Sequence, residues 1–206
     1  MKSAVLSLFT GIALLSLVSC KKSSGGSPTS LASQLPGTWK FLYLTAHTQS
    51  VAQETAGGST FKSVTVSDYT TINNAGTIVF TSDNFTTTGL TYEVSTTLYG
   101  AEYQDGLFLD SLSSPFDYVI PVSGSSVPYK AVGVDSLYFP AGGIAYTATN
   151  PVGVGQQPTG GGSRYTIHGD TLSVVSVAHQ SSTQNTPGDI VTTTVDAKET
   201  VILIKQ

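Results

Sequence analysis

The chain has almost no cysteine and little charge. Of its 206 residues one is cysteine, and Asp, Glu, Lys and Arg together make up 11%, under half of the share usual in soluble domains. A single cysteine excludes an intramolecular disulfide and a cysteine-rich metal site. The nine cationic residues, with Arg164 as the lone arginine, are too few and too scattered for a nucleic-acid-binding surface. We therefore expect no nucleic-acid partner.

Long apolar runs are also lacking, except at the N-terminus. Lys2 precedes the apolar stretch 4–18, whose length of about 15 residues falls short of the roughly 20 that a membrane-spanning helix needs. Ser19, a small residue, and Cys20 follow directly. A positive residue, an apolar run and a small residue in this order predict a secretory signal over residues 1–19.

The end of this signal, Leu17-Val18-Ser19-Cys20, resembles a bacterial lipobox. The resemblance implies that the Cys20 sulfur receives a diacylglycerol and that the chain is cleaved just before it. Two or more acyl chains anchor a protein stably, so we expect a lipid-anchored protein of the outer membrane that faces the periplasm or the cell surface. Residues 20–32, rich in serine and glycine, predict a flexible tether. One folded domain is expected over residues 33–206.

Helical signals are missing from that domain. We find no amphipathic stretch of ten residues, whereas short runs rich in β-branched and aromatic residues recur between glycine, asparagine and aspartate turns. This pattern predicts an all-β, antiparallel barrel or sandwich. Trp39, Phe41 and Tyr43 alternate, which places them on one face of the first strand. Gly169-Asp170 between two such runs predicts a type II′ hairpin turn.

Two stretches interrupt the strand pattern. Residues 113–128 hold Pro115, Pro121 and Pro128, and residues 150–162 are rich in glycine and proline. Proline cannot donate to a strand ladder, so both stretches are predicted to be long surface loops. Such loops either carry binding or are plain insertions.

The start of the domain resembles a known family. Residues 35–40, Leu-Pro-Gly-Thr-Trp-Lys, are similar to the Gly-x-Trp motif of lipocalins, and more closely to lipocalin-like domains of small bacterial outer-membrane lipoproteins. Residues 165–172 match their late Tyr-x-Ile-x-Gly-Asp-Thr-Leu hairpin. The resemblance implies a lipocalin-like β-barrel of about 8–10 strands. Gly37 would turn into the first strand, Trp39 would close the barrel end, and Lys205 is the positional candidate to stack over Trp39.

Motifs for catalysis are lacking. The chain has no Gly-x-Ser-x-Gly elbow, no His-Glu-x-x-His zinc motif and no phosphate-binding loop. Its histidines are scattered, and the aspartates of the middle third suit turns better than a calcium or glycan site; these residues are His47, His168, His179, Asp105, Asp110, Asp117 and Asp135. We therefore expect no enzyme, no cofactor and no metal site.

Two non-catalytic functions remain. In the first, the barrel mouth binds a small apolar or amphipathic molecule through aromatic residues that strand parity points inward: Phe41, Tyr43, Phe80, Tyr92 and Tyr165. In the second, side chains fill the barrel, and the protein is a scaffold or accessory subunit of an envelope complex.

Overall fold

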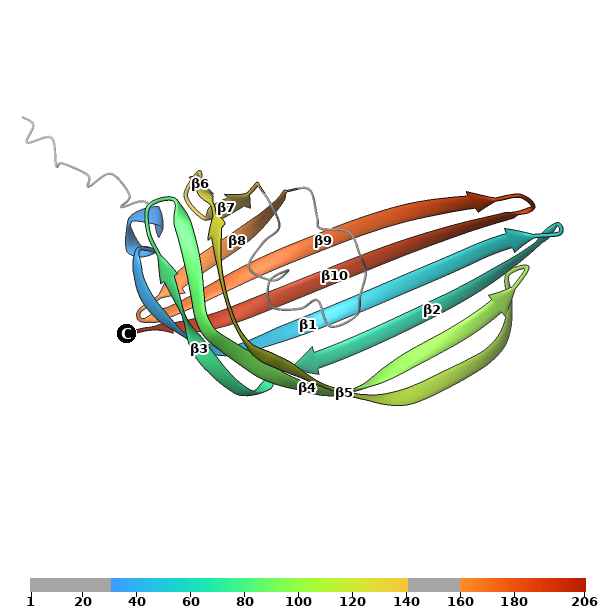
Figure 1. Ribbon diagram of the computed structural model, residues 1–206, viewed down its shortest axis with the longest axis horizontal. Coiled ribbons are helices and arrows are strands. Elements are labelled where there is room, and N and C mark those ends of the chain that lie inside the picture. Colours follow the sequence, from blue (N-terminus) through green and yellow to red (C-terminus); the bar gives the residue numbers. More distant parts are fainter. Residues whose placement is uncertain (1–30, 141–159) are drawn as a thin grey trace, which may run out of the picture.

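The computed structural model describes residues 31–140 and 160–206, and nearly all of them lie in antiparallel strands (Figure 1). The predicted all-β, antiparallel class is thereby confirmed. A short 3-10 helix, η1 (Leu31–Gln34), precedes the strands β1 (Gly37–Ala56), β2 (Ser59–Thr70), β3 (Ile72–Phe80), β4 (Asn84–Gln104), β5 (Leu107–Pro128), β6 (Lys130–Val132), β7 (Ser136–Phe139), β8 (Gly161–His168), β9 (Thr171–Thr186) and β10 (Asp189–Lys205).

All ten strands belong to one sheet, in the order β2-β4-β3-β1-β10-β9-β8-β7-β6, with β5 paired to β4 and β2 also paired to β1. The first half of β4 pairs with β3 and its second half with β2. Only Tyr129 separates β5 from β6, yet β5 pairs with β4 while β6 pairs with β7. The chain therefore passes directly from β5, which pairs with β4, to β6 at the far end of the sheet order.

The hydrophobic core lies at the end of the molecule that holds both η1 and the C-terminus (Figure 1). It contains the inward side chains of the strand segments at that end, among them Trp39, Phe85 and Leu203, all fully buried. Aromatic rings fill much of it: Phe80 meets Tyr129 edge to face at 5.7 Å between ring centroids, and Phe85 meets Phe139 in the same way at 5.6 Å. Such pairs stabilise a core beyond the area that they bury.

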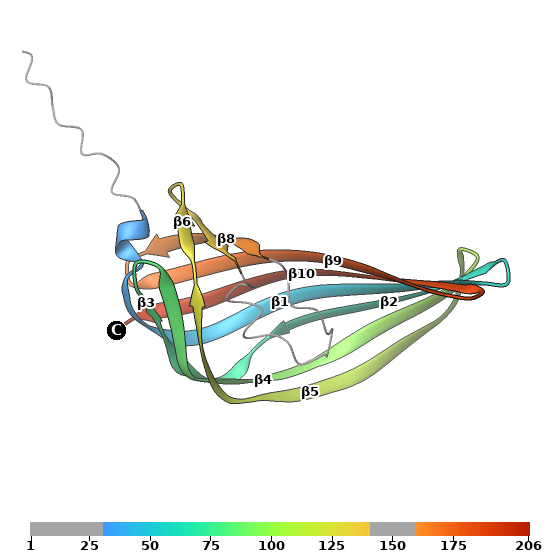
Figure 2. The ribbon, with the colours of Figure 1, turned by 45° about the horizontal axis from the view of Figure 1, so that its top comes forward.

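Three long hairpins extend from this core toward the opposite end of the molecule (Figures 1 and 2). We call their outer parts, residues 47–66, 95–118 and 177–198, the arm. No residue of the arm is buried. At about 3.4 Å per residue, the 20 residues of β1 span about 65 Å. The arm has no hydrophobic core of its own. Hydrogen bonds between its strands and pairs of polar side chains therefore hold it together.

The turns at the tips of the arm have the chemistry that two-residue hairpins require. Gly57, Gly58, Gly106 and Gly188 all have positive φ, and Asp105 reaches φ 52°. Glycine adopts this conformation without a steric cost, and aspartate tolerates it. The predicted turn at Gly169-Asp170 is confirmed, since His168 faces Thr171 across it and Gly169 has φ 57°.

The predicted direction of Tyr43 is wrong. A bulge between Phe41 and Tyr43 in the β1–β10 ladder shifts the alternation by one residue. Leu44 therefore points into the core, while Tyr43 points outward and is 38% exposed. An extra residue in one strand turns every later side chain to the other face.

The prediction of a loop over residues 113–128 is also wrong, because β5 runs through all three prolines. Within the described residues β5 pairs only with β4, so the missing N–H groups of Pro115 and Pro121 can face away from the ladder. Most of the other predicted loop, residues 150–162, lies outside the described residues, and Gly161 and Gly162 begin β8.

Candidate functional site

Four of the five predicted ligand-binding aromatics lie in the core. Phe41, Phe80, Tyr92 and Tyr165 are at most 2% exposed, whereas Tyr43 lies on the outer surface. Phe41 packs on Tyr92 at 5.9 Å between ring centroids, and Phe80 packs on Phe85 at 6.0 Å. These rings contact one another and the rest of the core.

The two predicted end-closing residues lie where β1 begins. Gly37 has φ +134°, a conformation that side-chain-bearing residues rarely adopt. The fully buried Trp39 donates its Nε1–H to the Leu35 carbonyl at 2.8 Å. Lys205 Nζ lies 5.3 Å from the centroid of the Trp39 ring and donates to the Gln34 carbonyl at 3.3 Å. The stacking of Lys205 over Trp39 is confirmed.

A polar cluster sits on the inner face of the sheet where the core ends. Ala46 of β1 faces Tyr69 of β2 on one side and Glu199 of β10 on the other, and Glu199 is 7% exposed. Burial, and next the charge of Glu199, raise the pKa of the Tyr69 phenol. Burial likewise raises the pKa of Tyr92, with smaller contributions from Tyr69 and Glu199. Both phenols therefore stay protonated at neutral pH.

The outer face of the same three strands carries a shallow hollow. Its volume is about 530 Å³, and its lining comprises Thr45, Ala46, His47, Asp68, Tyr69, Thr70, Lys198 and Thr200. The side chains form two rows across β10, β1 and β2, because Lys198 faces His47 and His47 faces Asp68, while Thr200, Thr45 and Thr70 are aligned in the same way. Sequence reasoning did not find this site.

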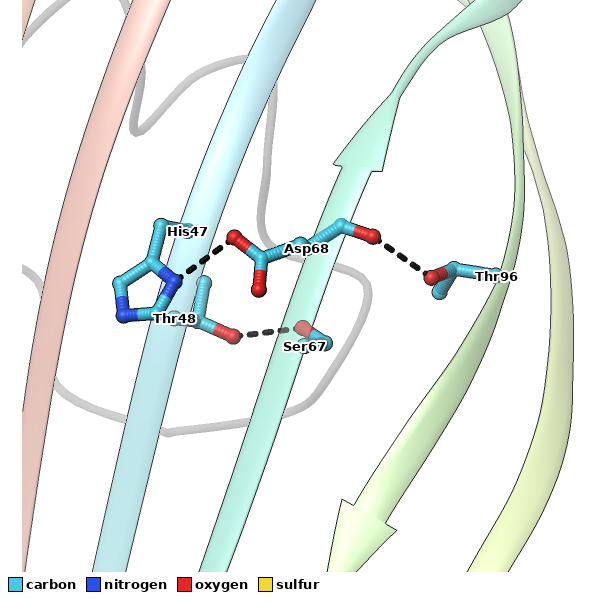
Figure 3. Close-up of polar contacts among 5 residues, drawn as sticks. All are labelled: His47, Thr48, Ser67, Asp68 and Thr96. Atoms are coloured by element: carbon cyan, nitrogen blue, oxygen red, sulfur yellow. Dashed lines mark hydrogen bonds and ion pairs between the residues drawn. The ribbon is translucent and has the colours of Figure 1, made fainter.

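The centre of the hollow is a histidine–aspartate pair (Figure 3). His47 Nδ1 lies 2.7 Å from Asp68 Oδ1, so Nδ1–H donates to the carboxylate. The Asp68 backbone carbonyl accepts from Thr96 Oγ1 at 2.7 Å, which ties β2 to β4. On the inner face, Thr48 Oγ1 and Ser67 Oγ lie 2.7 Å apart. Hydrogen bonds on both faces of the sheet thus hold the strands that carry the pair.

A histidine oriented by an aspartate supplies two of the three members of a catalytic triad, which also needs a nucleophile at the other ring nitrogen. Within the described residues the only side-chain hydrogen bond recorded for His47 is the one to Asp68. The side chains are 56% and 73% exposed, and a site open to water lacks the low dielectric that strengthens catalytic electrostatics. The exposed imidazole and carboxylate can both exchange hydrogen bonds with a polar group from solvent.

A second pair repeats this arrangement on the same outer face. His179 Nδ1 lies 2.6 Å from Asp196 Oδ1, and Asp196 faces Gln49, two residues beyond His47 on β1. Asp105 and Asp135 lie in turns as predicted, but the prediction is wrong for Asp110 and Asp117, which lie within β5. Asp105 Oδ1 accepts from the Thr60 N–H, and Asp110 Oδ1 accepts from the Ser111 N–H. In the described ranges no three His, Cys, Asp or Glu side chains come together as a metal site.

A scan against protein-family models and searches of curated proteins and of solved structures found no match. In the part of the chain that the structure describes, no helix has the length and apolar character to span a membrane. The predicted signal over residues 1–19, Cys20 and most of the tether over residues 20–32 lie outside the described residues.

Proposed function

We propose that the protein is a lipid-anchored, non-catalytic accessory subunit of an outer-membrane complex, and that the arm is its docking element. One observation carries the proposal: the core fills one end of the molecule with side chains, while three hairpins extend beyond it without a buried residue. A sheet whose side chains are not buried gains little stability from hydrophobic packing. Residues 47–66, 95–118 and 177–198 therefore present a large two-sided surface, with the polar hollow at its base.

The packed interior supports this role over binding of a small apolar ligand. A ligand inside the core would have to displace rings that already contact one another, such as Phe41 and Tyr92. If a panel of lipids and fatty acids raises the melting temperature of the purified protein, ligand binding is favoured instead. We expect no shift with any member of the panel.

We also propose that the core end is a lipocalin-like barrel that Gly37 and Trp39 close. Two observations support it. Lys205, from the last strand, stacks on Trp39. The chain passes through Tyr129 from β5, next to β4, directly to β6, next to β7. In a closed barrel the β5 and β6 edges of the sheet would meet. Protection of the backbone amides from hydrogen exchange on both sides of residues 127–132 would report this closure.

The decisive test of docking is a variant that lacks the arm's outer half. Gln180, Val195, Ser50, Thr65, Gly100 and Leu112 form one continuous row across β9, β10, β1, β2, β4 and β5. Replacing residues 51–64, 101–111 and 181–194 each by Asn-Gly cuts all three hairpins along this row, and Asn-Gly suits two-residue turns.

We expect the full-length protein to co-purify from membranes with a partner in near-equal amount, and the shortened variant to lose that partner. The control is His47→Asn with Asp68→Asn, which changes the hollow but keeps the arm. Equal recovery of the partner with the shortened variant contradicts docking through the arm. Loss with the double variant alone places the contact in the hollow.

The anchor has its own test. We expect intact-mass measurement of the mature protein to give a chain that starts at Cys20 and carries acyl groups, and we expect Cys20→Ser to move the protein into the soluble fraction. A free thiol on a membrane-bound protein would contradict the anchor without touching the docking proposal.

A further inference from the structure

The two edges of the arm differ in how they are protected. Across the arm the strand order is β5, β4, β2, β1, β10, β9, so β5 and β9 are the edges among the described strands. The arm part of β5 carries Asp110, Pro115 and Asp117. Charge and proline are the usual means by which an edge strand avoids pairing with another chain. The β5 edge is thus blocked.

The β9 edge has none of these residues. Beyond Ser176, which pairs with β8, residues 177–186 pair within the described ranges with β10 alone. Their sequence, Val-Ala-His-Gln-Ser-Ser-Thr-Gln-Asn-Thr, contains no Lys, Arg, Asp, Glu or Pro. Its one titratable side chain, His179, is paired with Asp196. Nearly the whole segment is exposed, with Val177 at 71%.

Along the β9 edge, the direction of each backbone N–H and C=O group follows from whether the residue number is even or odd. The Asp170 carbonyl accepts from the Lys205 N–H, and the β9–β10 ladder has no register shift, so even-numbered residues of β9 bond to β10. Odd-numbered residues point the other way, as Thr171 does toward β8. Residues 177, 179, 181, 183 and 185 therefore direct their N–H and C=O groups away from β10.

We propose that a second copy of this chain pairs with residues 177–186 of β9, antiparallel and about a two-fold axis at Ser181. In this register Ser181 faces its own copy, His179 faces Thr183, and Val177 faces Asn185, so all five outward residues find partners. A second copy fits because the edge is neutral and meets itself without like-charge repulsion. The contact is also self-complementary, which closes the assembly at two subunits.

This dimer has a definite geometry. The two arms lie side by side and point in opposite directions, which makes one continuous sheet through the pair. The two cores, each with its η1 helix, then lie at opposite ends.

Cysteine cross-linking in membranes tests the register. In a hydrogen-bonded antiparallel pair the facing Cα atoms are about 5.5 Å apart, so Ser181→Cys should cross-link to its own copy with a short bismaleimide. Val177→Cys is the matched control, since it lies on the same face and edge but about 27 Å from its copy. The wild-type chain, with Cys20 alone, controls for the anchor cysteine.

We expect the detergent-solubilised protein to be a dimer by light scattering. Ser181→Lys places two ammonium groups against each other at the axis and should weaken the dimer by about fivefold. Thr192→Lys, one strand inward on β10, should not weaken it. Far-ultraviolet circular dichroism checks that both variants keep their strands.

A monomer at all accessible concentrations overturns the proposal. So does a Val177→Cys variant that cross-links to itself as readily as Ser181→Cys, or cross-linking of Ser181→Cys to a different protein only. The proposal does not depend on the accessory function: a dimer that recovers no envelope partner would contradict docking alone, and a monomer that recovers one would contradict pairing through β9 alone.

Discussion

At the scale of single residues, the contact between Lys205 and Trp39 connects the first strand to the last. The ammonium group lies over the indole ring and also donates to the Gln34 carbonyl, so it joins β10, β1 and the end of η1. The Trp39 indole is fully buried, and its N–H is satisfied by Leu35. The contact with Lys205 therefore adds stability to an indole ring whose position core packing already fixes.

Lys205→Met should remove this attraction and keep the aliphatic part of the side chain. A solvent-exposed cation over an aromatic ring contributes about 0.5–1 kcal/mol, and Lys205 is exposed, so we expect the free energy of unfolding to fall by about that amount. Urea unfolding followed by the fluorescence of Trp39 measures the change. Lys205→Arg keeps the cation and should stay near wild type, and equal stability of all three proteins would contradict the contact.

Tyr92 is a buried phenol whose hydroxyl has no hydrogen-bond partner among the described residues. A buried hydroxyl without a partner costs about 1–3 kcal/mol, so Tyr92→Phe should leave the protein as stable at pH 7 or more stable. The exposed Tyr99 provides the control. Tyr99→Phe should leave the free energy of unfolding at pH 7 unchanged.

Alkaline pH should separate Tyr92→Phe from the wild-type protein. The folded-state pKa of Tyr92 is raised above the ordinary value of 10.0, so the unfolded chain loses this proton first. Its contribution to stability is full below pH 10 and declines as the pH rises above it. Wild type should lose stability faster than Tyr92→Phe between pH 9 and 11, as measured by urea unfolding. Parallel curves would contradict this prediction.

At the scale of elements, the sequence predicted strands well because alternation and turn residues are local signals. The hairpin at Gly169-Asp170 and the all-β class followed from such signals. The bulge before Tyr43 was not predictable, because it depends on how β1 meets β10. The strand through Pro115 and Pro121 was missed because proline is compatible with an edge, and only the topology shows that β5 is one.

The outer hollow could not be predicted for the same reason. His47 and Asp68 are 21 positions apart in the sequence, and Lys198 comes from the last strand. They meet only in the register that the β1–β2 turn and the β1–β10 ladder set together. The burial of Glu199 was within reach, because it continues the inward alternation of Leu203 and Val201.

The arm hairpins should open more easily than the strand segments around the core. They have no buried residue, and segments with few buried apolar contacts open with a small free energy. We expect native-state hydrogen exchange of the amides in residues 47–66, 95–118 and 177–198 to be faster than in residues 37–44 and 199–205. Mass spectrometry of proteolytic fragments measures both sets in one experiment, and uniform protection along β1 and β10 would contradict the expectation.

At the scale of the whole molecule, the buried apolar residues lie at one end, and we propose docking for the other. The variant cut along the row from Gln180 to Leu112 keeps every buried apolar residue. Its melting temperature should stay within about 5 °C of wild type, a change that corresponds to roughly 1 kcal/mol. Loss of cooperative unfolding in this variant would mean that the arm is part of the folding unit.

The placement of the chain ends has a mechanical consequence. The η1 helix and the C-terminus lie at one end and the hairpin tips at the other (Figures 1 and 2). A pulling force between a hairpin tip and η1 runs along the strands, at right angles to their ladder bonds. Many ladder hydrogen bonds then share the load in shear. A molecule loaded in this way should withstand tension far better than hairpins whose strands are peeled apart from one side.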